Sequence, residues 1–318
     1  NIFIYKDINN MEWKKIGRIF DTDYLPSDFK SHAQVPTPII IDGLLRIYFS
    51  SRDLNGKSFT LYADFNLDDF SMIHFEKNPI LNLGDPGTFD DDGVMPGYAI
   101  KNNGEIWIYY SGWNQKVKTP YHNSTGLAYS LDGKEFKRKY NGPILDRTKT
   151  EPHLAVTPTI MIEDGIWKMW YISGIKWIEV DSKFEPVYTI KYAESNDGID
   201  WNRFPEIVIQ HKSDDEVFSH PSVIKIDNVY HMWFSYRKIY DYRGGKNGYN
   251  MGYAYSYDGL NWHRDDSLSG IERSESGKWD SDMICYPSVF KSSDDYYMVY
   301  NGNYFGKSGF GLAKLKNN

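Results

Sequence analysis

Thr157-Pro158-Thr159, followed by the apolar run Ile160-Met161-Ile162, is one copy of a pattern that recurs along the chain. In each copy, a proline precedes a small or β-branched residue and then an apolar segment. The other copies are Val35-Pro36-Thr37, Met95-Pro96-Gly97, His220-Pro221-Ser222 and Tyr286-Pro287-Ser288, and successive prolines lie 60, 62, 63 and 66 residues apart. Self-similarity at a nearly fixed spacing is typical of repeat architectures. The sequence therefore predicts five copies of one structural unit.

Each unit is predicted to contain at least three strands. The run after the proline is the first, and a polar turn such as Asp42-Gly43 or Asp164-Gly165 then supplies the positive φ angles of a tight hairpin. The second and third strands are rich in aromatic and β-branched residues. The second strands are expected at Leu45–Ser50, Ile106–Ser111, Trp167–Ser173, Tyr230–Tyr236 and Tyr296–Asn301, and the third at Ser58–Asp64, Thr125–Ser130, Thr189–Ser195, Asn250–Ser256 and Phe310–Lys314.

A shared turn leads three of the units into a fourth strand. Its clearest copies are Ser195-Asn196-Asp197-Gly198-Ile199-Asp200-Trp201 and Ser256-Tyr257-Asp258-Gly259-Leu260-Asn261-Trp262, and Ser130–Phe136 is the third. We interpret this motif as structural, because Asp-Gly forms the turn and the aromatic residue can pack between adjacent sheets.

Five units of four antiparallel strands predict an all-β fold, a five-bladed β-propeller forming a single domain over residues 1–318. Closing the ring protects strand edges that a linear stack would expose. The last unit ends on its third strand, whereas Asn9–Lys15 resembles the segment Asp258–Arg264 that enters a fourth strand. We therefore expect an N-terminal strand to complete the last blade.

Composition narrows the function classes. The 318 residues carry a net charge of −7 without a basic stripe, so nucleic acid is not an expected partner, and no apolar stretch is long enough to span a membrane. Ten Trp and 26 Tyr suit a saccharide site, although blade packing would use most of them. The single Cys285, interpreted as an inert buried thiol, and the absence of a signal peptide at Asn1–Tyr5 favour a cytoplasmic location.

Acidic side chains precede the repeated prolines in four of the five units. In a propeller these segments would enter the channel, where paired carboxylates could hydrolyse a glycosidic bond. We expect Asp92 to act as the base and Glu151 or Glu216 as the acid, with Asp282 tuning a pKa. The alternative is that these are solvated loop carboxylates or a site for a structural cation such as Ca²⁺; no other cofactor is expected.

A second group of residues is expected to position the sugar. They lie beside the prolines or at the ends of the second strands, which would share one rim of the propeller: His32, Gln34, Arg52, Trp113, His153, His220 and Arg237. A rim of aromatic and arginine side chains suits a saccharide, including one with an anionic substituent. The histidines lack zinc-ligand spacing, so no catalytic metal is expected.

The repeated prolines and Ser-x-Asp-Gly-x-x-Trp turns resemble the five-bladed propellers of the invertase, arabinanase and xylosidase glycoside hydrolases, of family 32 and family 43 type. The resemblance covers the whole chain in architecture. It implies an Asp, an Asp and a Glu beside the prolines of blades one, three and four. The matching positions here read Gln34-Val35-Pro36, Val156-Thr157-Pro158 and Ser219-His220-Pro221, and none is acidic.

Three functional hypotheses follow from this departure. The first is a glycosidase, a hydrolase acting on O-glycosyl bonds, whose carboxylates have moved to Asp92, Glu151, Glu216 or Asp282. The second is a non-catalytic glycan-binding propeller, or a domain of a surface-glycan biosynthesis protein, whose partner is a saccharide or glycoconjugate. The third is a protein-interaction propeller, which predicts an apolar or charged top face and an empty channel.

Overall fold

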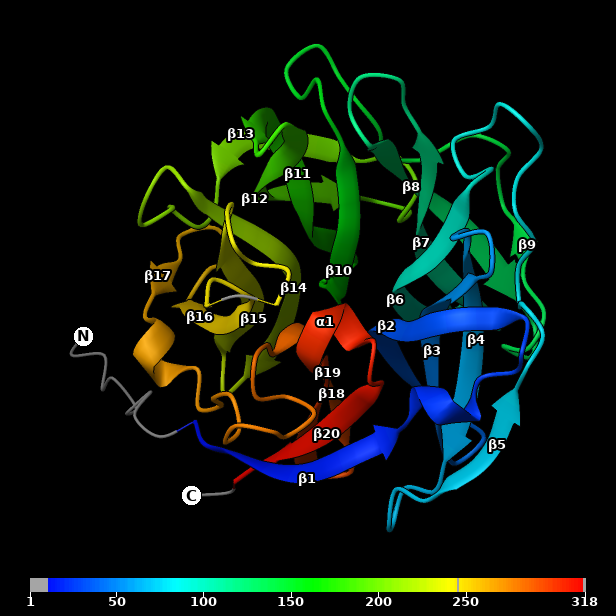
Figure 1. The fold of residues 1–318 in the computed structure, drawn as a ribbon. Coiled ribbons are helices and arrows are strands. Elements are labelled where there is room, and N and C mark those ends of the chain that lie inside the picture. The colour runs from blue at the N-terminus through cyan, green and yellow to red at the C-terminus, as the bar shows by residue number, and fades with distance from the viewer. Residues whose placement is uncertain (1–10, 245, 317–318) are drawn as a thin grey trace.

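The repeated sequence pattern becomes a repeated antiparallel sheet. A computed structural model describes residues 11–244 and 246–316, and within these ranges the successive sequence units pair into one twelve-stranded sheet and two four-stranded sheets (Figure 1). The first two units are β2 (Phe29–Ile41), β3 (Leu44–Asp53), β4 (Ser58–Phe65), β5 (Met72–Glu76) and β6 (Gly93–Asn102), β7 (Glu105–Gln115), β8 (Tyr121–Ser130), β9 (Lys137–Arg138). The third and fourth are β10 (Ala155–Glu163), β11 (Ile166–Val180), β12 (Lys183–Ser195), β13 (Asn202–Ile207) and β14 (Glu216–Ile226), β15 (Val229–Lys238), β16 (Asn250–Ser256), β17 (His263–Arg264).

The fifth unit draws its strands from both ends of the chain. It comprises β18 (Cys285–Ser292), β19 (Asp295–Asn301) and β20 (Phe310–Leu315), and β1 (Trp13–Phe20) pairs antiparallel with β20. The fourth strand expected from Trp13-Lys14-Lys15 is therefore present, whereas Asn9 and Asn10 lie outside the described residues. Short helical turns are η1 (Thr22–Tyr24), η2 (Asp266–Leu268) and α1 (Asn303–Gly306).

The hairpin turns have the backbone that their sequences predict. At the β2–β3 turn, φ is 51° at Asp42 and 76° at Gly43, and at the β10–β11 turn it is 51° at Asp164 and 79° at Gly165. Paired positive φ angles are the signature of the tight turns that match the twist of antiparallel strands.

The Ser-x-Asp-Gly turns join neighbouring units, which confirms their structural interpretation. In each case the glycine carbonyl accepts a hydrogen bond from an aromatic side chain of the preceding unit. The bonds run from Tyr48 Oη to Gly133 O (2.7 Å), from Tyr109 Oη to Gly198 O (2.8 Å) and from Trp170 Nε1 to Gly259 O (2.9 Å).

The first strands lie nearest the middle of the molecule and the fourth strands lie at its periphery (Figure 1). Each first strand contacts the next, from β2 through β6, β10 and β14 to β18, and β18 contacts β2. The five largest hydrophobic clusters each combine residues of two neighbouring units, including the fifth and the first, where Val299 and Phe310 meet Leu45. The core is thus distributed between the sheets.

A β-bulge lies at or directly after each repeated proline. The pairing register shifts between Gln34 and Thr37 in β2 and between Val156 and Thr159 in β10, and the same occurs at the prolines of β14 and β18, whereas in β6 the shift directly follows Pro96. A bulge leaves a residue unpaired, so the missing proline N–H costs no ladder hydrogen bond, and it redirects nearby side chains.

Cys285 is fully buried, and burial raises the pKa of its thiol. This agrees with its interpretation as an inert thiol. Among the described residues, no helix is long and apolar enough to cross a membrane.

Candidate functional site

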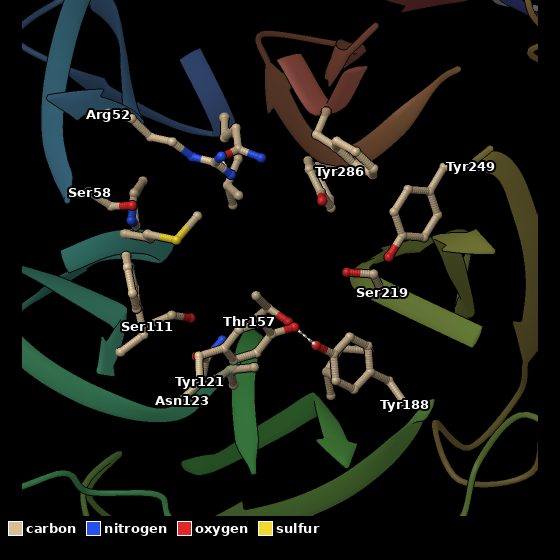
Figure 2. Close-up of a pocket in the computed structure, with 18 of the residues that line it drawn as sticks. Arg52, Ser58, Ser111, Tyr121, Asn123, Thr157, Tyr188, Ser219, Tyr249 and Tyr286 are labelled. Atoms are coloured by element: carbon tan, nitrogen blue, oxygen red, sulfur yellow. Dashed lines mark hydrogen bonds between the residues drawn. The ribbon is translucent and has the colours of Figure 1, made fainter. Parts of the chain in front are cut away.

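A cavity of about 380 Å³ opens where the first strands meet, and all five units contribute to it. This volume is within the range of about 300–1,000 Å³ that is typical of small-molecule sites. Figure 2 shows side chains from around the molecule arranged about an open centre. The lining comprises Gln34, Val35, Arg52, Gly56, Ser58, Met95, Pro96, Ser111, Trp113, Tyr121, Asn123, Val156, Thr157, Ile172, Tyr188, Ser219, Arg237, Tyr242, Arg243, Tyr249, Tyr286 and Phe305.

The proline bulges place several of these residues. Val35, Thr157 and Tyr286 directly precede repeated prolines, and their φ angles are 55°, 47° and 53°. A left-handed backbone is rare for any side chain and strained for β-branched Val and Thr, and such strain collects at functional sites. The repeat that defines the fold therefore also presents side chains to the pocket.

Gly93 leaves space for Trp113, the one tryptophan among the described residues that line the cavity. A Cβ atom on Gly93 would lie 1.7 Å from Nε1 of Trp113, so a larger residue could not share this place with the indole. The pairing of Gly93 in β6 with Trp113 in β7 sets this close approach. The β6–β7 pair thus supplies a flat aromatic surface beside the cavity.

Several residues that line the pocket carry polar atoms without partners in the protein. Four buried side-chain atoms of the lining make no hydrogen bond to any described residue: Ser111 Oγ, Asn123 Oδ1, Thr157 Oγ1 and Arg237 Nε. A buried polar group left unpaired costs roughly 1–3 kcal/mol, so such groups are rare unless a ligand or water satisfies them. They include donors and acceptors, which suits a ligand rich in hydroxyl groups.

Tyrosines form much of the remaining wall. Tyr121 and Tyr188 share a hydrogen bond through their hydroxyls, and the rings of Tyr249 and Tyr286 lie 5.7 Å apart (Figure 2). Burial raises the pKa of Tyr121 to about 12, and burial also raises the pKa of Tyr188 and Tyr286. The hydroxyls of these last three tyrosines are therefore neutral at physiological pH and can both donate and accept.

The structure brings together four of the seven residues expected to position a sugar. Gln34, Arg52, Trp113 and Arg237 line the cavity. The three histidines do not.

Each histidine has another setting. His32 is hydrogen-bonded to Ser31 Oγ (2.5 Å), and burial with the nearby Arg52 charge lowers its pKa to about 3. His220 is buried against the Tyr286 ring, and burial lowers its pKa to about 3. His153 is half-buried beside Gly174. Because the first two are neutral at physiological pH, neither supplies a positive charge to the pocket.

The structure does not bring the four expected catalytic carboxylates together. None of Asp92, Glu151, Glu216 and Asp282 lines the cavity, nor does any other Asp or Glu of the described residues. Their place in the sequence led us to expect them at the channel. They precede the repeated prolines by four to seven residues, however, and lie before the bulges that turn side chains inward.

Glu151 and Glu216 belong to a recurring buried arrangement. In four units a carboxylate that precedes the first-strand proline meets a basic residue of the fourth strand, and we call these pairs the carboxylate clasps. They are Asp90 with Arg138 (2.7 Å), Glu151 with Arg203 (3.6 Å), Glu216 with Arg264 (2.7 Å) and Asp280 with Lys15 (2.6 Å).

A tyrosine of the second strand completes three of the carboxylate clasps. Tyr110, Tyr171 and Tyr300 donate their hydroxyls to Asp90, Glu151 and Asp280 over 2.9–3.1 Å. Burial, followed by the adjacent carboxylate, raises the pKa of each of these tyrosines. Three clasps thus connect the segment that precedes a first strand with the second and fourth strands of the same unit, and Glu151 and Glu216 are engaged in structural contacts.

The other two expected carboxylates lie nearer the surface. The Asp92 carboxylate accepts from Gln115 N (2.9 Å) and forms an ion pair with Lys57 (3.4 Å). Asp282 is exposed, and Ser281 Oγ donates to it over 3.0 Å. Among the described residues, no group of three or more His, Cys, Asp or Glu is placed to hold a metal ion.

Several lining residues were not anticipated from the sequence. Ser111 and Asn123 lie in β7 and β8, and Tyr242, Arg243 and Tyr249 lie between β15 and β16. The pre-proline position of Tyr286 was a usable signal, because Val35 and Thr157 precede prolines at the same kind of bulge and also line the cavity. Tyr242 and Arg243 have no counterpart in the repeat, so column-by-column alignment could not select them.

Comparison with solved structures defines the class of fold. The chain is similar to a glycosyl hydrolase from Bacteroides ovatus (TM-score 0.73, 15% identity, 96% of this chain and 93% of that protein). It is also similar to a thermostable family-43 glycoside hydrolase (0.67, 18%, 93% and 91%) and to the Bombyx mori GH32 β-fructofuranosidase BmSUC1 (0.62, 13%, 92% and 63%). The chain therefore shares the fold of these glycoside hydrolases.

Sequence comparison finds relatives of higher identity than the solved structures above. An uncharacterized protein of Mycobacterium tuberculosis, MT1551 in strain CDC 1551 and Rv1502 in strain H37Rv, is 35% identical over 311 residues, covering 96% of this chain and 100% of the mycobacterial one. The chain belongs to the same family as these mycobacterial proteins. No protein-family model matches it.

Proposed function

We propose that the protein recognises a saccharide in the central pocket and does not cleave it through a pair of carboxylates. The observation that carries this proposal is the set of unpartnered buried donors and acceptors in residues that line a cavity walled by tyrosines and Trp113. Sugar hydroxyls both donate and accept hydrogen bonds, and aromatic rings cover their apolar faces. The fold shared with glycoside hydrolases agrees with a carbohydrate ligand.

The placement of the carboxylates supports recognition over hydrolysis. Hydrolysis by two carboxyl groups requires both to flank one glycosidic bond, at a separation of about 5–5.5 Å or about 6.5–9.5 Å. The described lining contains neither partner, and Glu151 and Glu216 are held in clasps. A binding function does not require Glu151 or Glu216, whose carboxylates are already held in the clasps.

The proposal includes the architecture that creates the pocket. The five units would be the blades of one closed five-bladed β-propeller, forming a single domain over residues 1–318. The cyclic contacts of the first strands, the clusters between units and the β1–β20 pairing support this closure. The channel of such a ring is the cavity in Figure 2.

Removing one unpartnered hydroxyl tests recognition. Thr157→Val keeps the side-chain shape and should weaken saccharide binding about fivefold to tenfold, because one hydrogen bond to the ligand is lost. Stability should be unchanged, because Thr157 Oγ1 has no partner among the described residues. Titration calorimetry against the saccharides selected by a glycan array gives the affinities, and urea unfolding gives the stability.

A matched threonine serves as the control. The Thr125 hydroxyl donates to Ala155 O over 2.9 Å, so Thr125→Val should lower stability and leave affinity unchanged. Asp92→Asn should bind saccharide as the parent does. The proposal fails if no saccharide binds, or if the protein hydrolyses a nitrophenyl glycoside and Asp92→Asn abolishes that activity.

A further inference from the structure

Arg237 is a buried cation without a carboxylate partner. It is 4% exposed, near the end of β15, and its guanidinium lies 3.6 Å from the Tyr242 ring centroid and 5.4 Å from that of Tyr249. Its Nη1 donates to the Lys238 carbonyl (2.9 Å), and its Nε has no partner among the described residues. A buried charge costs several kcal/mol unless it is paired, so this arrangement needs a compensating group.

The same chain pairs other buried arginines with carboxylates. Arg46 binds Asp64 through two contacts of 2.7 Å, and Arg264 binds Glu216 over 2.7 and 2.8 Å. In residues 11–244 and 246–316, no carboxylate lies within ion-pair distance of Arg237. Arg237 therefore differs from Arg46 and Arg264, whose charges are matched by carboxylates.

Arg52 adds a second unpaired guanidinium to the pocket. Its Nη2 donates to Gln34 Oε1 over 3.2 Å, a neutral acceptor, and Figure 2 shows it extending toward the open centre. Burial lowers its pKa from a very high ordinary value, so the group stays charged at neutral pH. Tyr286 lies within electrostatic range of both Arg52 and Arg237.

The third arginine of the described lining is already neutralised. Arg243 forms an ion pair with Glu185, and the same carboxylate accepts from Tyr242 Oη over 2.6 Å. Glu185 lies within electrostatic range of Arg237 but is held by these two partners and does not line the cavity. The described lining thus keeps the positive charges of Arg52 and Arg237.

We propose that the saccharide of the central pocket carries an anionic group, a carboxylate or a phosphate, that binds Arg237 with Arg52 as a second cation. This inference rests on the proposed function. Guanidinium groups match both oxyanions in shape and bind them through paired hydrogen bonds. The anion would supply the partner that the Arg237 Nε lacks, and the tyrosine hydroxyls and Thr157 would hold the sugar.

Matched sugars test the inference. Titration calorimetry with the wild-type protein would compare glucose, galactose and mannose with their uronates, their 1-phosphates and their 6-phosphates, with acetate and inorganic phosphate as sugar-free anions. We expect at least one anionic sugar to bind tenfold or more tightly than its neutral parent. A preference for uronates or for phosphates then identifies the anionic group.

Variants locate the anion. Arg237→Gln and Arg52→Gln should each reduce that affinity about tenfold to hundredfold, as expected for hydrogen bonds to charged groups, and binding of the neutral parent should change less than about twofold. Arg237→Lys keeps the positive charge and should retain part of the affinity. It takes the place of Arg237→Gln in this test if the glutamine variant folds poorly. Arg147→Gln removes an exposed charge outside the cavity and should bind as the parent does.

The outcomes separate the two proposals. Equal affinity for a neutral sugar and its anionic forms overturns the anionic inference and leaves saccharide recognition standing. If inorganic phosphate or acetate binds as tightly as the sugar derivatives, the site recognises an anion without a sugar, which contradicts the proposed saccharide ligand. Absence of binding by every member of the panel at millimolar concentration contradicts both.

Discussion

The carboxylate clasps and the central pocket use the same kind of side chain for different purposes. In the clasps, Arg264 is buried between Glu216 and Asp266, and its charge is matched on the spot. In the pocket, Arg237 is more deeply buried but stacks on Tyr242 and has no carboxylate partner among the described residues. Burial alone therefore does not distinguish structure from function. The difference is whether the protein itself supplies a carboxylate partner for each buried arginine.

The clasp of the fifth unit gives the largest expected effect, because it also holds β1. Deleting residues 1–17 removes Trp13, which packs on Trp233 at 5.2 Å, and Lys15, the partner of Asp280. It also exposes much of the β20 edge. We expect loss of cooperative unfolding and aggregation, measured by thermal circular dichroism and size-exclusion chromatography.

Point variants of β1 separate the clasp from the strand. Lys15→Gln should lower the unfolding midpoint, because it leaves the buried Asp280 unpaired, whereas Lys14→Gln, at an exposed neighbouring position, should not. If the truncated protein had the same unfolding midpoint as the full chain, the proposal that β1 closes the ring of units would be contradicted.

A pair of arginine variants puts the comparison directly to test. Arg264→Gln leaves Glu216 and Asp266 without their main partner and should reduce the free energy of unfolding by about 3–5 kcal/mol. Arg237→Gln removes a buried charge that has no carboxylate partner among the described residues, so it should not lower the free energy of unfolding. Urea denaturation of both variants measures these values. Equal losses would mean that Arg237 is structural and that the two regions do not differ.

A smaller effect is expected from acid, which should lower the free energy of unfolding through the buried His220. Burial holds the pKa of His220 at about 3, below the value of about 6.5 for an unfolded histidine. The unfolded chain therefore binds the proton first, and stability falls as pH decreases from about 6.5 toward 3. Between pH 7.5 and 5, this group should account for about 2 kcal/mol of lost stability.

His220→Gln isolates that contribution. The difference in unfolding free energy between parent and variant should shrink by about that amount as pH falls from 7.5 to 5, as followed by urea titrations at several pH values. Carboxylates with lowered pKa values, such as Asp146 at about 2, act only in more acidic solution. A difference that is constant across this range would contradict the buried, neutral state of His220.

The repeat made most of the strands predictable, and it also explains the main error. Turn residues and apolar runs set local geometry, so Asn250–Ser256 has the expected bounds and Trp13–Lys15 the expected partner strand. The recurring acids formed an equally regular pattern. Regularity, however, indicates a contact that every unit needs, and Glu151 and Glu216 proved to be clasp residues.

The pocket is harder to predict because its residues differ from unit to unit. Arg52 and Arg237 were found from their place at second-strand ends, where the alignment puts them on one rim. Tyr242 lies in a connection without a counterpart in the other units. Which side of a bulge a residue faces depends on backbone geometry such as the positive φ of Thr157, and spacing in the sequence does not encode that.

The most direct test is a crystal structure of the protein with the tightest-binding uronate or sugar phosphate of the panel. We expect the anionic group within hydrogen-bonding distance of the Arg237 guanidinium, the sugar ring beside the tyrosines, and Glu151 and Glu216 still in their clasps. A ligand bound against Glu151 or Glu216, or with its anionic group turned away from Arg237 and Arg52, would contradict the division between clasps and pocket.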